Sequence, residues 1–167
     1  MQVRRASVED CEELWRWAND PETRTVSYSA APIPWPDHVT WLHAKLADKN
    51  CALYIAQLDC GTPIGQVRFD LLDAATAVVS ISLARHYRSK GHGSQVLRMA
   101  TDTCLAETGV AEIVAFIKTT NERSIRCFTK AGFSDPELVL LNGAESLRLV
   151  RRLPKSSDHS HEDSQHL

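Results

Sequence analysis

A loop rich in glycine and basic residues joins an apolar, alternating segment to a segment of helical periodicity. The loop spans residues 88–93 and reads RSKGHG. Backbone N–H groups at the start of a helix lack intrahelical partners and carry partial positive charge, so they can bind phosphate oxygens. Glycines let an anion approach the backbone closely. The loop therefore predicts a site for a phosphate-bearing cofactor, with an ordinary basic turn before a helix as the alternative.

The side chains of the loop support the same prediction. Arg88 and Lys90 bring positive charge, while Ser94 can cap the turn or donate its hydroxyl to a phosphate oxygen. The expected cofactor-binding residues of this segment are Arg88, Ser89, Lys90, Gly91, His92, Gly93 and Ser94.

The pattern R-x-x-G-x-G over residues 88–93, placed after a strand, resembles the acetyl-coenzyme A motif of the GNAT N-acetyltransferase superfamily. A second block, NERSIRCFTKAGF over residues 121–133, resembles the Asn-x-x-Ser/Ala-x-x-x-aromatic-x-x-x-Gly-Phe signature of the same superfamily. The resemblance covers residues 1–153. It implies acetyl-CoA as co-substrate and transfer of its acetyl group to a primary amine.

Strands and helices must position these motifs, and they alternate along the chain. This order predicts an α/β protein with a mixed, mostly antiparallel central sheet and helices on both faces. The resemblance implies the GNAT fold, in which the strand before the loop and the strand after the third helix splay apart to hold acetyl-CoA. We expect strands over residues 1–5, 51–59, 63–71, 76–84, 112–118 and 145–153 and from 132, and helices over 7–18, 36–48, up to about 107, and 121–131.

Composition predicts one globular domain. With 167 residues, of which 43% are hydrophobic, the chain can bury one substantial core, which we place at residues 1–153. Residues 154–167 are polar and are expected to be a disordered tail. The tail contains three histidines, His159, His161 and His166, for which no metal site is expected.

Charge and cysteine usage limit the partners. Lys and Arg number 19 against 21 acidic residues, so the chain lacks the basic excess typical of nucleic-acid binding. Its five cysteines have no disulfide or zinc spacing and are expected to be reduced. No apolar segment resembles a signal peptide or reaches membrane-spanning length, which predicts a cytoplasmic protein without a membrane partner. Family relatives vary in oligomeric state, so a homodimer stays open.

The resemblance also implies roles near the thioester. It places Ser82, Leu83 and Ala84 along the pantetheine arm of the cofactor, where they offer main-chain hydrogen bonds. A backbone N–H near Leu83 would face the thioester oxygen, where negative charge grows during attack.

The second motif block contributes three expected cofactor contacts. Asn121 matches a position where the family uses an amide near the cofactor, and a helix cap is its alternative. Ser124 lies one turn later and could also cap the helix. Phe128 stands where many relatives place a tyrosine that donates a proton to the departing thiolate, so that role is vacant here or filled by another group.

The amine acceptor requires a base, because an alkyl ammonium must lose a proton before it attacks. His38 and Asp70 are the main candidates, with Glu22 and His86 less favoured. His38 lies on the expected second helix, where a packed or surface histidine is the alternative.

The N-terminal third carries the substrate prediction. The patterns W-x-N-D-P-x-x-R-x-x-S over residues 17–27 and P-x-x-x-H-x-x-W-L over 34–42 are similar to aminosugar N-acetyltransferases of the pseudaminic-acid type. These act on a nucleotide-linked, UDP-type 4-amino-4,6-dideoxy sugar. Aromatic faces can stack on sugar or uracil rings, and arginines can bind a diphosphate. The expected substrate-binding residues are Trp17, Arg24, Ser27, His38, Trp41 and Arg68.

Several alternatives remain at this level. Trp15 is expected in the core, and Arg68 could pair with Asp70, because residues two apart on a strand share a face. A ribosomal-protein-type N-terminal acetyltransferase is the nearest rival activity, and antibiotic or polyamine acetylation also fits. A non-catalytic acetyl-CoA sensor is a different class, suggested by Phe128.

Overall fold

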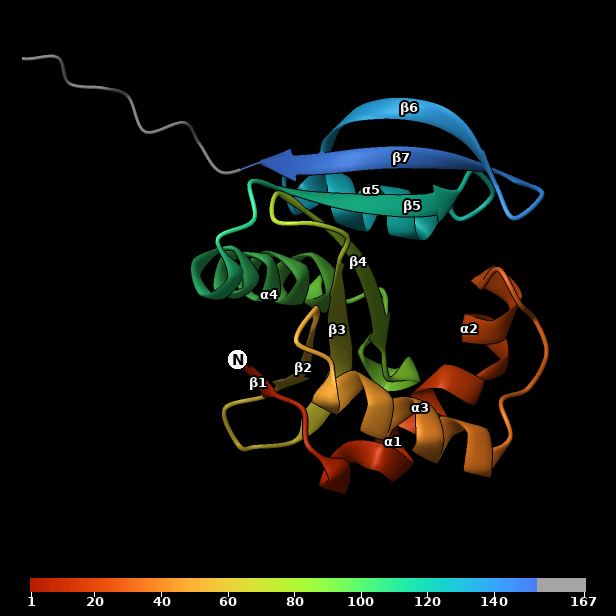
Figure 1. The fold of residues 1–167 in the computed structure, drawn as a ribbon. Helices are drawn as coiled ribbons and strands as arrows, with labels where there is room; N and C mark the ends of the chain where they lie inside the picture. The colour runs from red at the N-terminus through yellow and green to blue at the C-terminus, as the bar shows by residue number, and fades with distance from the viewer. Residues whose placement is uncertain (153–167) are drawn as a thin grey trace, which may run out of the picture.

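The computed structural model describes residues 1–152, which form one seven-stranded sheet with helices packed on it (Figure 1). The strand order is β1-β2-β3-β4-β5-β7-β6. Only β4 and β5 pair in parallel, and every other neighbouring pair is antiparallel. This confirms the predicted mixed, mostly antiparallel sheet. The polar tail and its histidines lie outside the described residues.

The element boundaries follow the expected ones closely. The strands are β1 (Gln2–Arg5), β2 (Cys51–Gln57), β3 (Pro63–Leu71), β4 (Thr76–Leu83), β5 (Glu112–Lys118), β6 (Ser134–Leu141) and β7 (Ala144–Arg152). The α-helices are α1 (Cys11–Asn19), α2 (Pro21–Val26), α3 (Trp35–Ala47), α4 (His92–Thr108) and α5 (Glu122–Lys130), with 3-10 turns at Val8–Asp10 and Arg85–Tyr87. Residues 22–35, to which the sequence analysis assigned neither a helix nor a strand, begin within the short helix α2.

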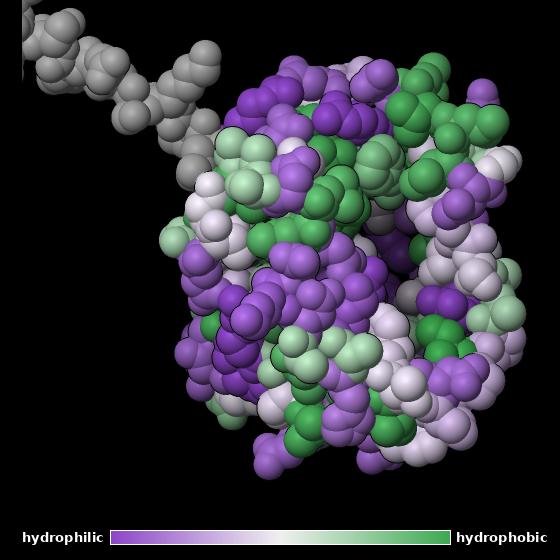
Figure 2. Space-filling model, in the orientation of Figure 1, coloured by the Kyte–Doolittle hydropathy of each residue, from purple (hydrophilic) through white to green (hydrophobic). Residues whose placement is uncertain are grey.

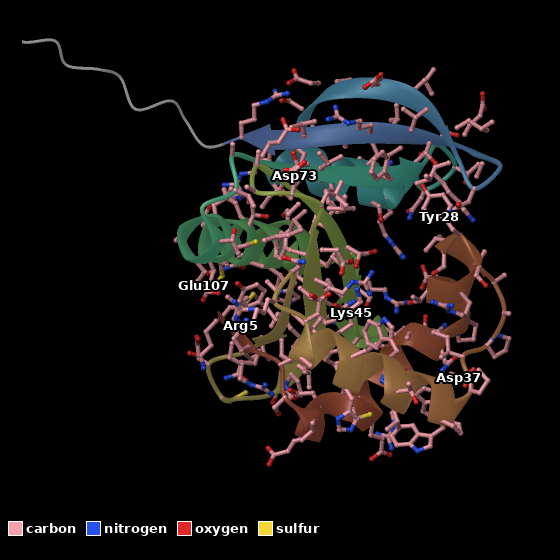
Figure 3. The ribbon with its side chains drawn as sticks, viewed as in Figure 1. Arg5, Tyr28, Asp37, Lys45, Asp73 and Glu107 are labelled. Atoms are coloured by element: carbon pink, nitrogen blue, oxygen red, sulfur yellow. The ribbon has the colours of Figure 1, made fainter. Side chains whose placement is uncertain are left out.

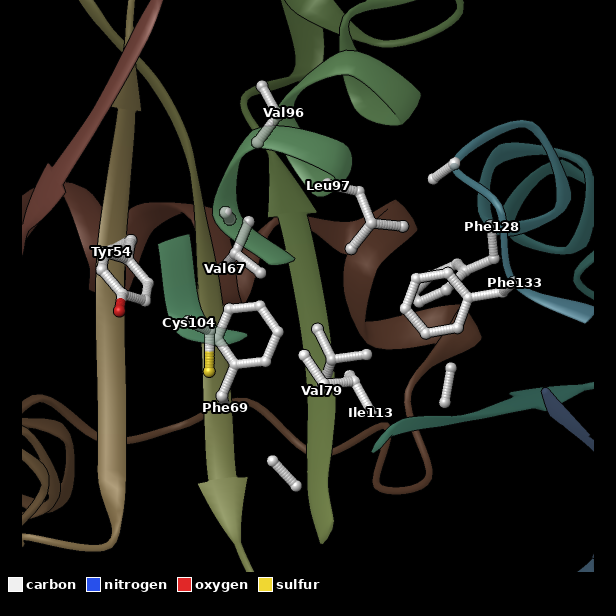
Figure 4. Packing of buried hydrophobic residues seen from close by; sticks show 14 of the residues in the cluster. Tyr54, Val67, Phe69, Val79, Val96, Leu97, Cys104, Ile113, Phe128 and Phe133 are labelled. Atoms are coloured by element: carbon white, nitrogen blue, oxygen red, sulfur yellow. The ribbon is translucent and has the colours of Figure 1, made fainter. Parts of the chain in front are cut away.

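Two hydrophobic clusters lie on opposite faces of the sheet. On β2, the even-numbered residues 52, 54 and 56 pack in the cluster shared with α4 and α5, part of which Figure 4 shows. Leu53 and Ile55 point the other way and pack against Leu14 and Leu42 of α1 and α3. Successive side chains of a strand alternate between faces, so the apolar run of β2 indicates burial on both sides. The helices therefore cover both faces, as predicted.

The parallel pairing between β4 and β5 is short. It joins Thr76–Val78 to Glu112–Val114, after which β4 continues to Leu83 and β5 to Lys118 without a shared ladder. The two strands therefore splay apart beyond Val78 and Val114. This confirms the gap that the family resemblance implied.

The phase of the first helix differs from the prediction. The Ser7 capping box forms, but the first turn is a 3-10 turn, Val8–Asp10, which has three residues per turn. After that turn the buried face of α1 includes Trp17, at 6% exposure, beside Leu14, which was expected in the core and is 3% exposed, whereas Val8 is 54% exposed. Trp15 is only half-buried and donates its indole N–H to the Ile33 carbonyl. The expected assignment of Trp15 to the core and Trp17 to the substrate was therefore wrong.

Candidate active site

Two cavities meet at the splayed strands. The loop cavity, about 330 Å³, lies between the Arg88–Ser94 loop, the end of β4 and α5. The gap cavity, about 550 Å³, lies between β4 and β5 and is closed by α2, α3 and the segment after α2. Ser82 and Ser124 line both cavities, so the two are continuous. In Figure 2 the surface is hollowed between the half that contains β5–β7 and the half that contains α2 and α3.

The start of α4 gives the loop cavity its anion-binding character. Gly91 caps the helix with φ +82°, a left-handed conformation that glycine adopts without strain. Gly93 lies against α5, where an added Cβ would come within 2.9 Å of Cys127 Sγ. Ser94 donates its hydroxyl to the Gly91 carbonyl and thus acts as a local cap. No side chain makes a capping hydrogen bond to the first turn of α4, so its free N–H groups can bind a phosphate.

Three cations of α5 also line the loop cavity, and the sequence analysis did not single them out. They are Arg123, Arg126 and Lys130. Their spacing of three and four residues places them along one side of the helix. That spacing within the second motif block was the signal that could have identified them. Together with the amides of α4, they fit a ligand that carries several phosphates, such as acetyl-CoA.

Arg88 corrects the sequence prediction. It lines the loop cavity, but its side chain is 9% exposed and its guanidinium is committed to the protein. Nε donates to the Leu83 carbonyl at 2.9 Å, and Nη1 donates to Asp20 at 2.7 Å and to Glu22 at 2.9 Å. Nη2 donates to Thr23 Oγ1 at 3.0 Å. Arg88 therefore ties α2 to the end of β4, because its charge and most of its N–H groups are already used.

The other loop residues divide into two groups. Ser89, at φ +59°, lines the loop cavity. Lys90 is exposed and His92 packs edge-to-face on Tyr87, and neither lines a cavity. Ala84 also lies outside both cavities, because its N–H donates to Ile64 O in the sheet. These three expected cofactor contacts are therefore not placed at the site.

The same Ala84 hydrogen bond fixes the direction of the main chain at the gap. Backbone groups on alternate residues of an antiparallel strand point to opposite edges. Because Ala84 and Ser82 bond toward β3, the N–H and C=O of Leu83 and Ile81 point toward the splayed gap. Arg88 occupies the Leu83 carbonyl, which leaves the Leu83 N–H as a donor facing the gap. This geometry fits the expected donor to a thioester oxygen.

The residues of the second motif block, 121–133, mainly cap α5 and pack it against the rest of the protein. Asn121 caps α5 by accepting the Ser124 N–H at 3.2 Å, and both residues line the gap cavity. Phe128 is 4% exposed and packs edge-to-face on Phe133, with ring centroids 5.0 Å apart. Phe128 reaches the gap cavity only as part of its apolar wall.

His38 is the expected base that the structure places at the gap cavity. It is 2% exposed, and its Nε2 lies 3.0 Å from the Cys11 carbonyl oxygen. A carbonyl oxygen only accepts, so Nε2 carries the proton and the lone pair of the neutral ring resides on Nδ1. Burial lowers the pKa of His38 below its usual 6.5 despite the bond to Cys11. His38 is therefore neutral and able to accept a proton near pH 7.

The remaining base candidates are placed unfavourably. Asp70 is outside both cavities and accepts from Lys45 Nζ at 2.6 Å and Arg68 Nε at 2.8 Å. Burial raises its pKa, but the two cations outweigh burial and hold that pKa below its usual value. Glu22 is ion-paired with Arg88 and Arg123, which lowers its pKa as well, and His86 is exposed outside both cavities. Asp70 is accordingly a structural ion-pair partner.

Most expected acceptor residues do line the gap cavity: Arg24, Ser27, His38, Trp41 and Arg68. Arg68 pairs with Asp70, as the alternative proposed, and its guanidinium lies 5.4 Å from the Trp41 ring centroid. Trp17 is the exception, because it is buried in the core with Leu14 and Leu42.

Tyr28 and Lys118 line the same cavity and were missed by the sequence analysis. Tyr28 extends from the segment after α2 to the far half of the molecule, where its hydroxyl lies 2.8 Å from Ser146 Oγ on β7 (Figure 3). Lys118, the last residue of β5, donates to the Ser27 carbonyl at 2.6 Å. No local sequence signal marked either residue, because their importance depends on a contact between distant segments.

The gap cavity has an excess of positive charge. Its lining contains the cations Arg24, Arg68 and Lys118, of which Arg68 is paired with Asp70, and the single carboxylate Asp37, while His38 is neutral. An acceptor with negative charge fits this lining better than a polycation.

Comparison of the chain with known protein families identifies the class of enzyme to which it belongs. Residues 1–134 match the acetyltransferase (GNAT) domain model, so the chain belongs to the GNAT acetyltransferase family. It is an acetyl-CoA-dependent N-acetyltransferase, with acetyl-CoA as its co-substrate. This assignment favours an enzyme over a binding module without activity.

Solved structures confirm the fold. Aminoglycoside acetyltransferase AAC(6')-Ib, in complex with coenzyme A and kanamycin, matches with TM-score 0.78 and 22% identity over 90% of this chain and 94% of that one. Spermidine N-acetyltransferase from Vibrio cholerae, in complex with CoA and spermine, matches with TM-score 0.81 and 14% identity over 90% and 94% of the two chains. No curated protein sequence matches the chain significantly.

Residues 1–152 lack features of two other kinds of site. None of the helices there has the length and apolar character needed to cross a bilayer. The same part of the chain brings no three His, Cys, Asp or Glu side chains into a group suited to a metal ion.

Proposed function

We propose that the enzyme acetylates a primary amine on a small molecule that also carries negative charge, most specifically the 4-amino group of a UDP-linked 4-amino-4,6-dideoxy sugar. The charge of the gap cavity carries this proposal, since, within residues 1–152, Arg24 and Lys118 line it without a carboxylate partner and its only lining carboxylate is Asp37. A diphosphate complements such a lining.

Polycationic acceptors suit this cavity poorly. The matched structures contain kanamycin and spermine, and each of these ligands carries several amines. Recognition of several ammonium groups requires carboxylates, and like charges facing each other cost binding energy. With the single carboxylate Asp37 in its lining, the gap cavity favours an acceptor other than a polyamine.

His38 is the proposed base. Its Nδ1 would accept the proton that the acceptor ammonium must lose, while the Cys11 carbonyl holds the Nε2–H and orients the ring. The Leu83 N–H, directed into the gap, would stabilise negative charge on the acyl oxygen. Acetyl-CoA supplies the acyl group when bound, with its phosphates at the α4 amides and the α5 cations.

A substrate panel tests the proposal. Thiol release from acetyl-CoA is measured with a UDP-linked 4-amino sugar, an N-terminal peptide of a ribosomal protein, kanamycin and spermine. We expect the highest kcat/KM for the nucleotide sugar. Higher kcat/KM for the peptide would establish the N-terminal acetyltransferase alternative, and preference for kanamycin or spermine would contradict the charge argument.

We further propose that two copies associate and that the enzyme works in a reducing compartment such as the cytoplasm. Leu138 and Leu140 on the edge strand β6 are 69% and 75% exposed and point to the same face. All five cysteines are free thiols. Light scattering tests the dimer, with Leu138→Lys expected to give a monomer, and imaging of the tagged protein in its host tests the compartment.

A further inference from the structure

Two cations from distant segments converge on one residue of the gap cavity. Arg24, on α2, donates from Nη2 to Ser27 Oγ at 3.2 Å. Lys118, at the end of β5, donates to the carbonyl oxygen of the same serine at 2.6 Å. Both cations line the gap cavity, and both are bound there only by neutral oxygens. Two like charges are thus gathered around Ser27 without an anion between them.

Arg24 differs from comparable arginines in residues 1–152. Five arginines there are half-buried, and four of them, Arg68, Arg88, Arg148 and Arg151, each pair with a carboxylate. Arg24 instead contacts only Ser27 and the Ser29 carbonyl, and its Nε is buried without a partner. Burial alone shifts its pKa, downward, because no neighbouring carboxylate opposes the effect.

Tyr28 completes this corner of the cavity. The centroid of its ring lies 5.6 Å from Lys118 Nζ, and Ser146, which is fully buried, holds its hydroxyl. The aromatic ring therefore contacts Lys118 on one side, while the Ser27 carbonyl accepts from its Nζ. A buried cation without a counterion is costly, and an oxyanion that accepts from both cations would remove that cost.

We propose that Arg24 and Lys118 form an anion subsite that binds an oxyanion of the acceptor and selects anionic amines over neutral or cationic ones. This inference rests on the proposed function and deepens it, since it names the residues that recognise the negative charge of the acceptor. The recognised chemistry is an oxyanion, a phosphate or carboxylate group, because guanidinium and ammonium groups bind both through charge-assisted hydrogen bonds.

The direct test is calorimetric binding of inorganic pyrophosphate to the enzyme saturated with coenzyme A, so that the loop cavity is filled. We expect Arg24→Gln and Lys118→Met each to weaken pyrophosphate binding by about tenfold, a change typical of losing one charge-assisted contact. Arg24→Lys should recover part of the affinity. Arg85→Gln is the matched control, because Arg85 also lacks a carboxylate partner but is exposed outside both cavities.

Kinetics provide the second measurement. With a UDP-linked amino sugar, Arg24→Gln should raise the acceptor KM by about tenfold and change kcat little, because the contact binds the acceptor before and during reaction alike. Malonate and pyrophosphate as inhibitors distinguish a carboxylate from a phosphate source. Absence of pyrophosphate binding, or equal binding by wild type, Arg24→Gln and Lys118→Met with melting temperatures unchanged, would overturn the subsite. Intact pyrophosphate binding without turnover of any nucleotide sugar would reject the proposed function alone.

Discussion

The loop cavity and the gap cavity are built in different ways. The loop cavity uses main-chain amides of one continuous strand-loop-helix segment, supplemented by the cations of α5. The gap cavity uses side chains from α2, α3, β3 and β5, brought together across the splayed strands. A main-chain site depends on backbone conformation and tolerates changes in side chains, whereas a side-chain site changes its ligand through single substitutions. The comparison explains how one family can keep its cofactor and vary its acceptor.

The largest effect on kcat is expected from substitution of His38, the proposed general base in the gap cavity. His38→Gln should lower kcat by about 100-fold or more, the usual contribution of a positioned general base. In the wild type, kcat should fall only at a pH below the 6.5 of an ordinary histidine, because burial lowers the pKa of His38 and delays its protonation. The measurement is kcat of the wild type and of His38→Gln across a range of pH, which shows whether the rate falls on the acidic side.

His43→Gln provides the control for that experiment, because His43 is exposed on the same helix and lies outside both cavities. It should leave kcat and the pH profile unchanged. An acidic limb that persists in His38→Gln would assign the base to another group.

Gly91→Val tests the main-chain site. A β-branched residue at φ +82° is strained by about 1–3 kcal/mol, and its side chain stands at the lining of the loop cavity. We expect the affinity for coenzyme A, measured by calorimetry, to fall about 30-fold or more. Gly109→Val is the matched control, since Gly109 ends the same helix at φ +71° away from both cavities. If both variants lose equal affinity, strain in α4 and not the cavity lining is responsible.

Arg88 and Arg126 separate structure from cofactor binding within the loop cavity. Arg88→Gln should lower the free energy of unfolding by about 2–3 kcal/mol, because it leaves the Asp20 carboxylate without its partner. Arg126→Gln should change stability little and raise the KM for acetyl-CoA about fivefold, since its pair with Glu122 is exposed. Chemical denaturation and steady-state kinetics measure the two effects. The reverse pattern would restore Arg88 as the main phosphate ligand.

Asp70→Asn should have the smallest effect on the chemical step. Asp70 neutralises Lys45 and Arg68 outside both cavities, so kcat should change by less than about threefold. Single-turnover kinetics can measure this. A loss as large as that of His38→Gln would show that Asp70 takes part in proton transfer.

The sequence predicted the fold because its local signals agreed. Alternation in β2–β4, Gly109 after α4 and the two motif blocks all indicated the observed elements. The same signals placed Gly91, Gly93, Ser94 and Leu83 at the site, since their function depends on backbone geometry within one segment. Trp17 was misplaced because the 3-10 turn at Val8–Asp10 shifts the helix phase, which a regular period of 3.6 residues does not capture.

The sequence by itself determined where backbone amides gather and which segment is the candidate phosphate site, because those features arise between neighbours in the chain. Only the tertiary structure decided which charged side chains are left without an ion-pair partner. It paired Arg88 with Asp20 and Arg68 with Asp70, and it left Arg24 beside Lys118 without a carboxylate. Ion pairing depends on distances between segments far apart in sequence, and for that reason the acceptor preference of this enzyme is a property of its folded form.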